Sequence, residues 1–389
     1  MLPIALKSFH IKNYRGIIDT QIDDIPDNTQ WIFLTGENGF GKTSVLQGIS
    51  HVLNKIEKKG SFFLCSIYDG YRKTLHSSED IISIPFNSGF LQFNTESLQQ
   101  NFFFKTNRKI IAYGSTRLRI SAGSANEVMD KYSSIESLFS NEVLLINVEE
   151  NFKDWKINYK KGYIQLENIF KTLIPRLGKI EVEVEEKTKR NKVKYYELDL
   201  EGNLLKDSVE LNDLAAGYKN ILGMVGDMIN RLTRESVPDN LSSIEGIVLI
   251  DEIDLHLHPK YQKLFVEKLT ELFPKIQFIV STHSPIPLLG VGKDIKASII
   301  NVSRTREHGI KAELLDIDFS VLTPNAILSS PIFGFQDLIP ESKSDDKMIR
   351  TEDTYKEVLF NDQLDKQISE YLTEDNQKEL LDLLKEHNL

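Results

Sequence analysis

Short apolar runs alternate with stretches of helical periodicity along much of the chain. The runs have the length of buried strands and occupy residues 31–34, 110–113, 247–250 and 276–280. Apolar residues recur three or four positions apart, as on one face of a helix, in residues 45–56, 214–232 and 260–273. This alternation of buried strands and helices predicts an α/β fold, in which ligands bind at the carboxyl ends of the strands.

Strict alternation of apolar and polar residues marks a second group of elements. It predicts half-buried strands, the last two forming a hairpin, at residues 6–16, 21–25, 180–185 and 193–200. The other predicted elements are a short helix, a strand and a terminal amphipathic helix, at residues 133–139, 143–146 and 371–387. Residues 61–104 show no sustained period, so we expect strands and loops there.

The strongest motif lies between the first apolar run and the helix that follows it. It fits G-x-x-x-x-G-K-[ST], the loop that cradles nucleotide phosphates, and consists of Gly36, Glu37, Asn38, Gly39, Phe40, Gly41, Lys42, Thr43 and Ser44. The glycines allow a tight turn that brings main-chain N–H groups to phosphate oxygens, and the helix dipole adds to this attraction. Lys42 would reach the β- and γ-phosphates of ATP, and the Thr43 hydroxyl would ligate Mg²⁺.

A carboxylate pair follows the third apolar run. Asp251 would hold Mg²⁺ through water, and Glu252 would act as general base towards the attacking water. His283 follows the fourth run, where it is placed to sense or hydrogen-bond the terminal phosphate. His256 and His258 might suggest a metal site beside the aspartates, but no third distant ligand can be nominated. A transition-metal site is therefore not favoured.

Three weaker features leave alternatives open. The periodic helix before the third apolar run begins beside Gly217, where main-chain N–H groups would be open to an anion, and Asn212 or Asp213 could cap it. Arg117 follows the second run and could face a phosphate or a partner subunit, or be solvated on a turn. The basic segment 153–194 is a candidate nucleic-acid or partner surface, although charged hairpins are more often solvated faces.

Composition narrows the class of protein. The chain has 389 residues with 40% hydrophobic and 27% charged residues, which describes an ordinary soluble globular protein. Its formal net charge of −10 argues against permanent coating by nucleic acid. No apolar run approaches about 20 residues and no signal peptide is evident, so we expect a cytoplasmic protein without a membrane partner. The single cysteine, Cys65, excludes an intrachain disulfide and a multi-cysteine zinc site.

These motifs resemble those of the ABC-class, SMC-like ATPases of prokaryotes. More narrowly, the chain resembles the AAA family ATPases of Septu-type, retron-associated, PARIS-type and overcoming-lysogenization anti-phage systems. The segments that carry the resemblance are residues 13–16, 36–44, 113–117, 214–220, 251–259 with Gln262, and 281–285. The resemblance implies a P-loop ABC-type ATPase head with an antiparallel β subdomain, a helical second lobe and a short helical C-terminal tail. The head would be a composite domain over residues 1–310 with a lobe-two insertion at about 60–210, and the tail would occupy 311–389.

The resemblance also implies an ATP-sandwich dimer or a higher homo-oligomer. ATP on the phosphate loop of one subunit would be closed over by the signature segment around Gly217 of another, and Arg15 would contact phosphate. Two residues depart from the family pattern. Ala215 stands where a serine is usual, which removes a hydroxyl contact to the γ-phosphate and can slow hydrolysis. Phe40 replaces a small residue, with little effect expected because its peptide N–H can still donate.

Three functions are compatible with these features. The first is an ATPase that senses or regulates a separately encoded effector such as a nuclease, in anti-phage defence, because the ATP and Mg²⁺ motifs are complete and no nuclease site is found. The second is a DNA repair or recombination ATPase of the RecF kind, which DNA would stimulate. The third is a nucleotide-locked scaffold with little turnover, supported by Ala215 alone. The absence of a long coiled coil disfavours a true SMC role, and the signature segment disfavours a transporter subunit.

Overall fold

The computed structural model describes residues 2–53, 62–68, 73–77, 81–86, 89–94, 109–117, 119–185, 191–292 and 294–315 of the 389-residue chain. All of these residues belong to the first of two compact units, Met1–Gln336. The second unit, Asp337–Leu389, lies wholly outside the described residues. The terminal helix predicted at 371–387 and the implied helical tail therefore lie outside them as well.

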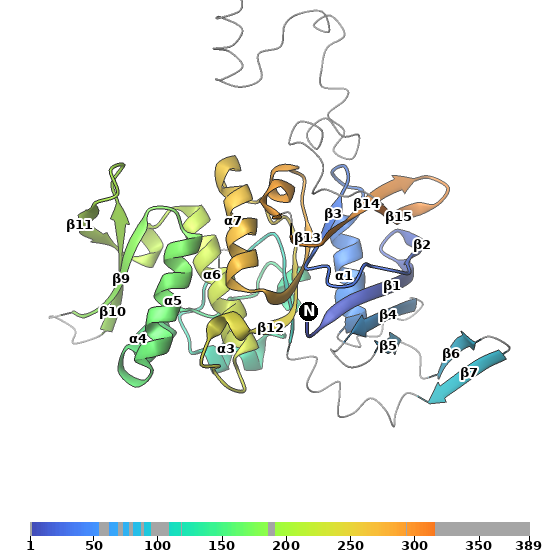
Figure 1. Cartoon of the computed structure of the whole chain (residues 1–389), viewed down its shortest axis with the longest axis horizontal. Coiled ribbons are helices and arrows are strands. Elements are labelled where there is room, and N and C mark those ends of the chain that lie inside the picture. The colour runs from blue at the N-terminus through green and yellow to red at the C-terminus, as the bar shows by residue number, and fades with distance from the viewer. Residues whose placement is uncertain are drawn as a thin grey trace, which may run out of the picture. The chain divides into compact units, whose positions relative to one another are not determined.

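Five parallel strands form one half of a ten-stranded sheet, from β14 to the edge strand β8 (Figure 1). In spatial order they are β14 (Ala297–Thr305), β3 (Trp31–Thr35), β13 (Lys275–Ser281), β12 (Glu245–Ile250) and β8 (Ile110–Tyr113). Four of them coincide with the four apolar runs, and their residues are almost entirely buried. The α/β fold and its four buried strands are confirmed.

The sheet continues beyond β14 with antiparallel pairing. These strands, from β14 outwards, are β15 (Gly309–Leu315), β2 (Ile17–Ile22), β1 (Ala5–Tyr14), β4 (Phe62–Tyr68) and β5 (Lys73–Ser77). The implied antiparallel β subdomain is thereby confirmed. The strand predicted at 21–25 is misplaced, because the positive φ angles of Arg15 and Gly16 close a two-residue hairpin that starts β2 at Ile17. A separate hairpin pairs β6 (Ile81–Phe86) with β7 (Gly89–Asn94).

The parallel strands divide their side chains between two hydrophobic cores. Ile32 and Leu34 of β3 pack with the apolar face of α1 (Lys42–Leu53). Trp31 and Phe33 point to the opposite face and join a larger core that includes helix residues from the second half of the chain. This alternation along one strand explains why a continuous apolar run is needed, since both faces of the sheet are covered.

The second lobe consists of helices and a small sheet. Its helices are α3 (Ala125–Lys131), α4 (Glu149–Asn158), α5 (Lys160–Leu173) and α6 (Ala216–Leu232), and α7 (Pro259–Leu272) packs beside α5. Its three-stranded sheet has the order β11 (Leu204–Val209), β10 (Asn191–Leu198) and β9 (Leu177–Val184). The predicted hairpin is confirmed as β9 and β10. Among the described residues, no helix is both long and apolar enough to cross a bilayer.

Two predictions in this lobe are wrong. The run at 143–146 does not form a strand, because only a single parallel bridge joins Ile120 to Leu145. Val143, Leu145 and Ile146 are buried by packing instead. The helix predicted at 133–139 is reduced to a 3₁₀ turn, Glu136–Leu138.

Candidate functional site

The phosphate loop joins β3 to α1 in a conformation that requires glycine. The φ angle is +130° at Gly36, +80° at Gly39 and +97° at Gly41. A Cβ on Gly36 would lie 2.2 Å from the carbonyl oxygen of Val302, and a Cβ on Gly41 would lie 2.3 Å from Cδ1 of Ile310. Glycine therefore serves both the turn and the close packing of the loop on β14 and β15.

The tip of the loop is open, whereas its lysine lies beneath it. Residues 37–39 are exposed, and Lys42 is only 5% exposed. Its Nζ donates hydrogen bonds to the carbonyl oxygens of Gly36 at 2.7 Å and Glu37 at 3.0 Å. The same Nζ lies 3.0 Å from Nδ1 of His283. The structure thus brings together two of the predicted catalytic residues, Lys42 and His283.

Burial shifts the pKa of three groups around the loop. It lowers the pKa of Lys42 to about 8, against the opposing effect of the carboxylates of Asp251, Asp254 and Glu252. It lowers the pKa of His283, and the Lys42 ammonium acts in the same direction. It raises the pKa of Glu252, as do the like charges of Asp251 and Asp254. Each shift favours the uncharged form of the group.

Asp251 follows β12 and lies against the start of α1. Thr43 Oγ1 donates a hydrogen bond to Oδ2 of Asp251 at 2.8 Å, and Ser281 Oγ donates to Oδ1 at 2.5 Å. Because β3, β13 and β12 are adjacent and parallel, the phosphate loop, Ser281 and Asp251 meet at their carboxyl ends. Hydroxyl and carboxylate oxygens are ligands that Mg²⁺ prefers, so Thr43 and Asp251 fit this ion. The role of Ser281 was not predicted, although it is the first polar residue after an apolar run.

Glu252 is held by its main chain. Its φ angle is +51°. Its N–H donates to Ser281 Oγ at 2.7 Å, and its carbonyl oxygen accepts a hydrogen bond from Nη2 of Arg117 at 2.6 Å. Within the described part of the chain, no hydrogen bond reaches its carboxylate. The carboxylate can therefore accept a hydrogen bond from water, as a general base must.

The alternatives left open for Arg117 are all wrong. The side chain is 1% exposed, so it faces neither solvent, nor a bound phosphate, nor the surface of a partner. It points inward and donates to main-chain carbonyl oxygens, including those of Asp251 and Glu252. A residue that follows a strand is expected on a turn, but Arg117 is buried and donates to Asn220 of α6.

Gly217 is the second residue of α6 and packs closely on the segment after β12. A Cβ on Gly217 would lie 2.8 Å from the carbonyl oxygen of His256. The cap of α6 is Ala215, which makes no side-chain hydrogen bond. The predicted capping by Asn212 or Asp213 is wrong, because both belong to a separate 3₁₀ turn, Leu211–Asp213.

Arg15 and His258 have contacts of their own. Arg15 is exposed, and its Nη1 donates to Oε1 of Gln47 on α1 at 2.5 Å. Its predicted contact with phosphate stays a prediction.

His258 accepts a hydrogen bond from the N–H of Lys260 at 3.3 Å and so caps α7. This contact gives His258 a structural role.

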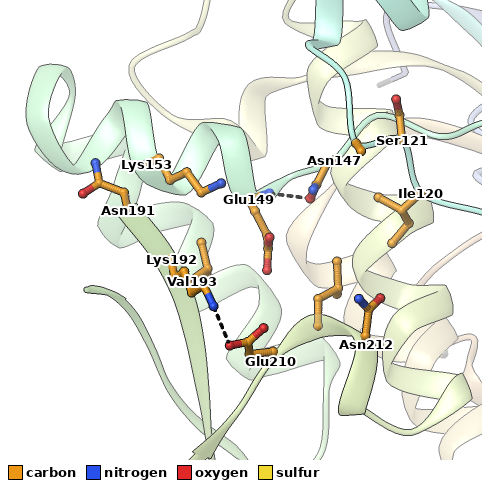
Figure 2. A pocket seen from close by; sticks show the side chains of 12 residues that line it. Ile120, Ser121, Asn147, Glu149, Lys153, Asn191, Lys192, Val193, Glu210 and Asn212 are labelled. Atoms are coloured by element: carbon orange, nitrogen blue, oxygen red, sulfur yellow. Dashed lines mark hydrogen bonds and ion pairs between the residues drawn. The ribbon is translucent and has the colours of Figure 1, made fainter. Parts of the chain in front are cut away.

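A cavity of about 310 Å³ lies in the second lobe, between α4, β10 and the turn before α6 (Figure 2). It is lined by residues 120–122, Asn147, Glu149, Lys153, residues 191–193 and residues 210–212. Lys192 on its wall pairs with Glu210 at 3.3 Å, and Lys153 pairs with Glu150 at 2.8 Å. The cavity shares no residue with the phosphate loop, and its lysines are already paired with acids. It is therefore distinct from the candidate nucleotide site.

Comparison with known protein families identifies the class of this chain. The family described as AAA ATPase domain matches residues 80–286, which is more than half of the chain. The chain belongs to this AAA ATPase family. The prediction of an AAA-class ATPase is thereby confirmed.

Similar proteins include a Septu protein and a retron ATPase. The chain is 31% identical over 354 residues to a Septu protein PtuA of Bacillus mycoides, covering 86% of this chain and 46% of the relative. It is 40% identical over 131 residues to a Retron Vc95 probable ATPase of Vibrio cholerae, covering 33% and 23% of the two chains. The chain thus spans less than half of the length of these relatives.

The crystal structure of an Smc head domain from Pyrococcus furiosus, bound to the C-terminal domain of ScpA, shows a weak likeness. Its TM-score is 0.48 at 14% identity, over 80% of this chain and 96% of that chain.

Proposed function

We propose that the protein binds ATP with Mg²⁺ on the phosphate loop and hydrolyses it. One observation carries this proposal: the 2.8 Å hydrogen bond between Thr43 Oγ1 and Asp251 Oδ2. It joins two segments 208 positions apart, the phosphate loop and the carboxylate pair. P-loop ATPases need these two segments in one place, because one binds the phosphates and the other completes the Mg²⁺ site.

Each residue has a role that its position supports. The N–H groups of the loop would bind phosphate oxygens, and Lys42 would exchange its carbonyl partners for the β- and γ-phosphates. Thr43 and Asp251 would hold Mg²⁺, which supplies positive charge beside the phosphates. Glu252 would take a proton from the attacking water, and His283 would hydrogen-bond the terminal phosphate.

We further propose that ATP closes a homodimer or a higher homo-oligomer, which regulates a separately encoded effector such as a nuclease in anti-phage defence. Gly217 supports the first part, since it lies in the first turn of α6, where N–H groups lack helical partners. The second part is supported by relatives named as a Septu protein and as a retron ATPase.

A DNA repair ATPase receives less support from the described surface. Four lysines of the basic segment 153–194 are paired with acidic residues. The pairs are Lys153–Glu150, Lys179–Glu181, Lys192–Glu185 and Lys194–Glu210. Neutralised lysines offer little attraction for a phosphate backbone. The negative net charge of the chain acts in the same direction.

The test is the rate of phosphate release from MgATP by the wild type and by Glu252→Gln. Removing a general base should lower kcat by about 10²-fold or more, whereas binding of a fluorescent ATP analogue should persist. Size-exclusion chromatography with ATP should then show the oligomer accumulating in the variant. Equal turnover of the two proteins would exclude Glu252 as the base. A wild type that binds the ATP analogue but releases almost no phosphate in a single-turnover experiment would instead favour the nucleotide-locked scaffold.

A matched control is available on the same strand. Glu245 begins β12, at the end opposite to Asp251, and contacts Lys109. Glu245→Gln makes the same chemical change outside the site, so it should keep kcat near the wild-type value. A comparable loss in both variants would indicate general damage to β12.

A further inference from the structure

Arg117 is a buried cation for which the proposed ATP hydrolysis assigns no role. Its guanidinium donates three hydrogen bonds to main-chain carbonyl oxygens, those of Gly114 at 3.0 Å, Asp251 at 2.5 Å and Glu252 at 2.6 Å. Its Nε donates to Oδ1 of Asn220 at 2.9 Å. A buried charge is tolerated only where its donors are satisfied, so this set of acceptors defines the position of the side chain closely.

Two of these carbonyls belong to the residues proposed as magnesium ligand and general base. Glu252 has the left-handed φ angle that non-glycine residues avoid, and such a conformation persists only where its surroundings hold it. Ser281 holds the N–H of Glu252 from the side of β13, and Arg117 holds its carbonyl oxygen from the side of β8. Since no hydrogen bond from the described residues reaches the carboxylate, its direction is set by this clamped main chain.

The fourth hydrogen bond of Arg117 connects it to α6, the helix that carries Gly217. Asn220 lies on α6, three residues after Gly217, and is 3% exposed. Its Oδ1 accepts from Arg117, and its Nδ2 donates to the carbonyl oxygen of Leu255 at 3.2 Å. The helix that carries Gly217 therefore contacts the carboxylate segment through the buried side chain of Asn220, besides the close packing of Gly217 on His256.

We propose that Arg117 is a positioning residue that aims the carboxylate of Glu252, and that Asn220 makes this aim depend on the position of α6. The proposal rests on the proposed ATP hydrolysis. A guanidinium suits the task because its planar donors point in fixed directions and reach several carbonyls at once, whereas an ammonium is a point donor. Contact of Gly217 with the nucleotide of another subunit would thus be transmitted to Glu252 of the same chain through two hydrogen bonds.

The experiment compares Arg117→Lys and Asn220→Ser with a matched control. Arg231 also lies on α6, is 8% exposed and forms an ion pair with Asp227 at 2.9 Å, but it does not contact Asp251 or Glu252. Arg231→Lys therefore makes the same change in another buried arginine. The measurements are kcat and KM for MgATP, affinity for a fluorescent ATP analogue, and thermal unfolding of the full chain.

A displaced Glu252 carboxylate should lower kcat without changing KM. We expect Arg117→Lys to lower kcat by about 10²-fold with KM and analogue affinity within about twofold of wild type, since a small displacement of a reacting group has effects of this order. Asn220→Ser should lower kcat by a smaller factor, again without change in KM. Arg231→Lys should leave kcat near wild type even where it lowers the unfolding temperature.

Several results would overturn the proposal. These are an unchanged kcat in a folded Arg117→Lys protein, an equal loss of kcat and analogue affinity, and an equal loss of kcat in Arg231→Lys. If Arg117→Lys does not fold, Asn220→Ser decides, and an unchanged kcat there overturns the proposal. A wild type without magnesium-dependent hydrolysis would overturn the proposed function and this inference together, whereas wild-type turnover with unchanged variants overturns this inference alone.

Discussion

ATP binding to this protein should be coupled to proton uptake at alkaline pH, because burial lowers the pKa of Lys42 to about 8. Before ATP binds, Lys42 loses its proton as the pH rises through 8. A triphosphate beside the ammonium favours the charged form and returns the pKa towards its ordinary value of about 10.4. Between these two pKa values, binding therefore takes up a proton, and affinity falls as the pH rises.

The size of the effect follows from the pKa of Lys42. Uptake should be about 0.1 proton at pH 7, about 0.5 at pH 8 and about 0.9 at pH 9, the fractions of Lys42 that are unprotonated before binding. Well above pH 8 the affinity should fall about tenfold, or about 1.4 kcal/mol, per pH unit. His283 adds little in this range, because its pKa is lowered and the ring is already neutral.

The assay is isothermal titration calorimetry with a non-hydrolysable ATP analogue and saturating Mg²⁺. Titrations at each pH in two buffers of different ionisation enthalpy give the number of protons taken up. Lys42→Arg is the control, since a guanidinium keeps its proton over the whole range. Its binding should show no uptake at pH 9. Uptake near zero in the wild type at pH 9, or the same uptake in Lys42→Arg, would refute the reasoning.

Two further predictions concern main-chain geometry. Gly36→Ala should weaken binding of the ATP analogue by about tenfold or more and destabilise the fold, because its Cβ would meet the carbonyl oxygen of Val302. Gly39→Ala, also at positive φ but with no atom within 4 Å of its Cβ, should be milder in both calorimetric and denaturation assays, and the reverse order would contradict the argument. Ala215→Ser should raise the free energy of unfolding by about 0.5–2 kcal/mol, because it supplies the side-chain cap that α6 lacks. Denaturant titration checks this against Ala216→Ser, which enters the first turn and should not stabilise.

The parts of the fold that could be predicted from the sequence are those determined locally. A strand buried on both faces needs a continuous apolar run, so β3 and β12 are visible in the sequence without knowledge of their neighbours. The phosphate loop is equally local, because the positive φ angles of its turns restrict them to glycine. The helix α5 also had a local signal, an apolar stripe over Leu166, Ile169 and Phe170, which its basic composition obscured.

The parts that could not be predicted depend on distant contacts. The run at 143–146 has the composition of a strand, but whether it pairs is decided by the segments that pack around it. Arg117 follows a strand and is charged, so its sequence context favours solvent. Its burial becomes favourable only because carbonyl oxygens from Asp251 and Glu252, more than 130 positions away, converge on it.

The opposite pKa shifts of Lys42 and Glu252 have one cause and a common consequence for the proposed hydrolysis. Burial makes charge less favourable at both groups, so it brings the pKa of Lys42 down to about 8 and brings that of Glu252 up from its ordinary value. A raised pKa makes Glu252 a stronger base, whereas a lowered pKa limits the pH at which Lys42 can still attract phosphate. The two pKa values therefore set the ends of a pH range. The pKa of Lys42 sets the upper end, below which the lysine is charged, and the pKa of Glu252 sets the lower end, above which the carboxylate can accept a proton. A main chain that holds Glu252 in place without neutralising its carboxylate preserves this arrangement, because an ion pair to the side chain would lower the pKa that the buried site has raised.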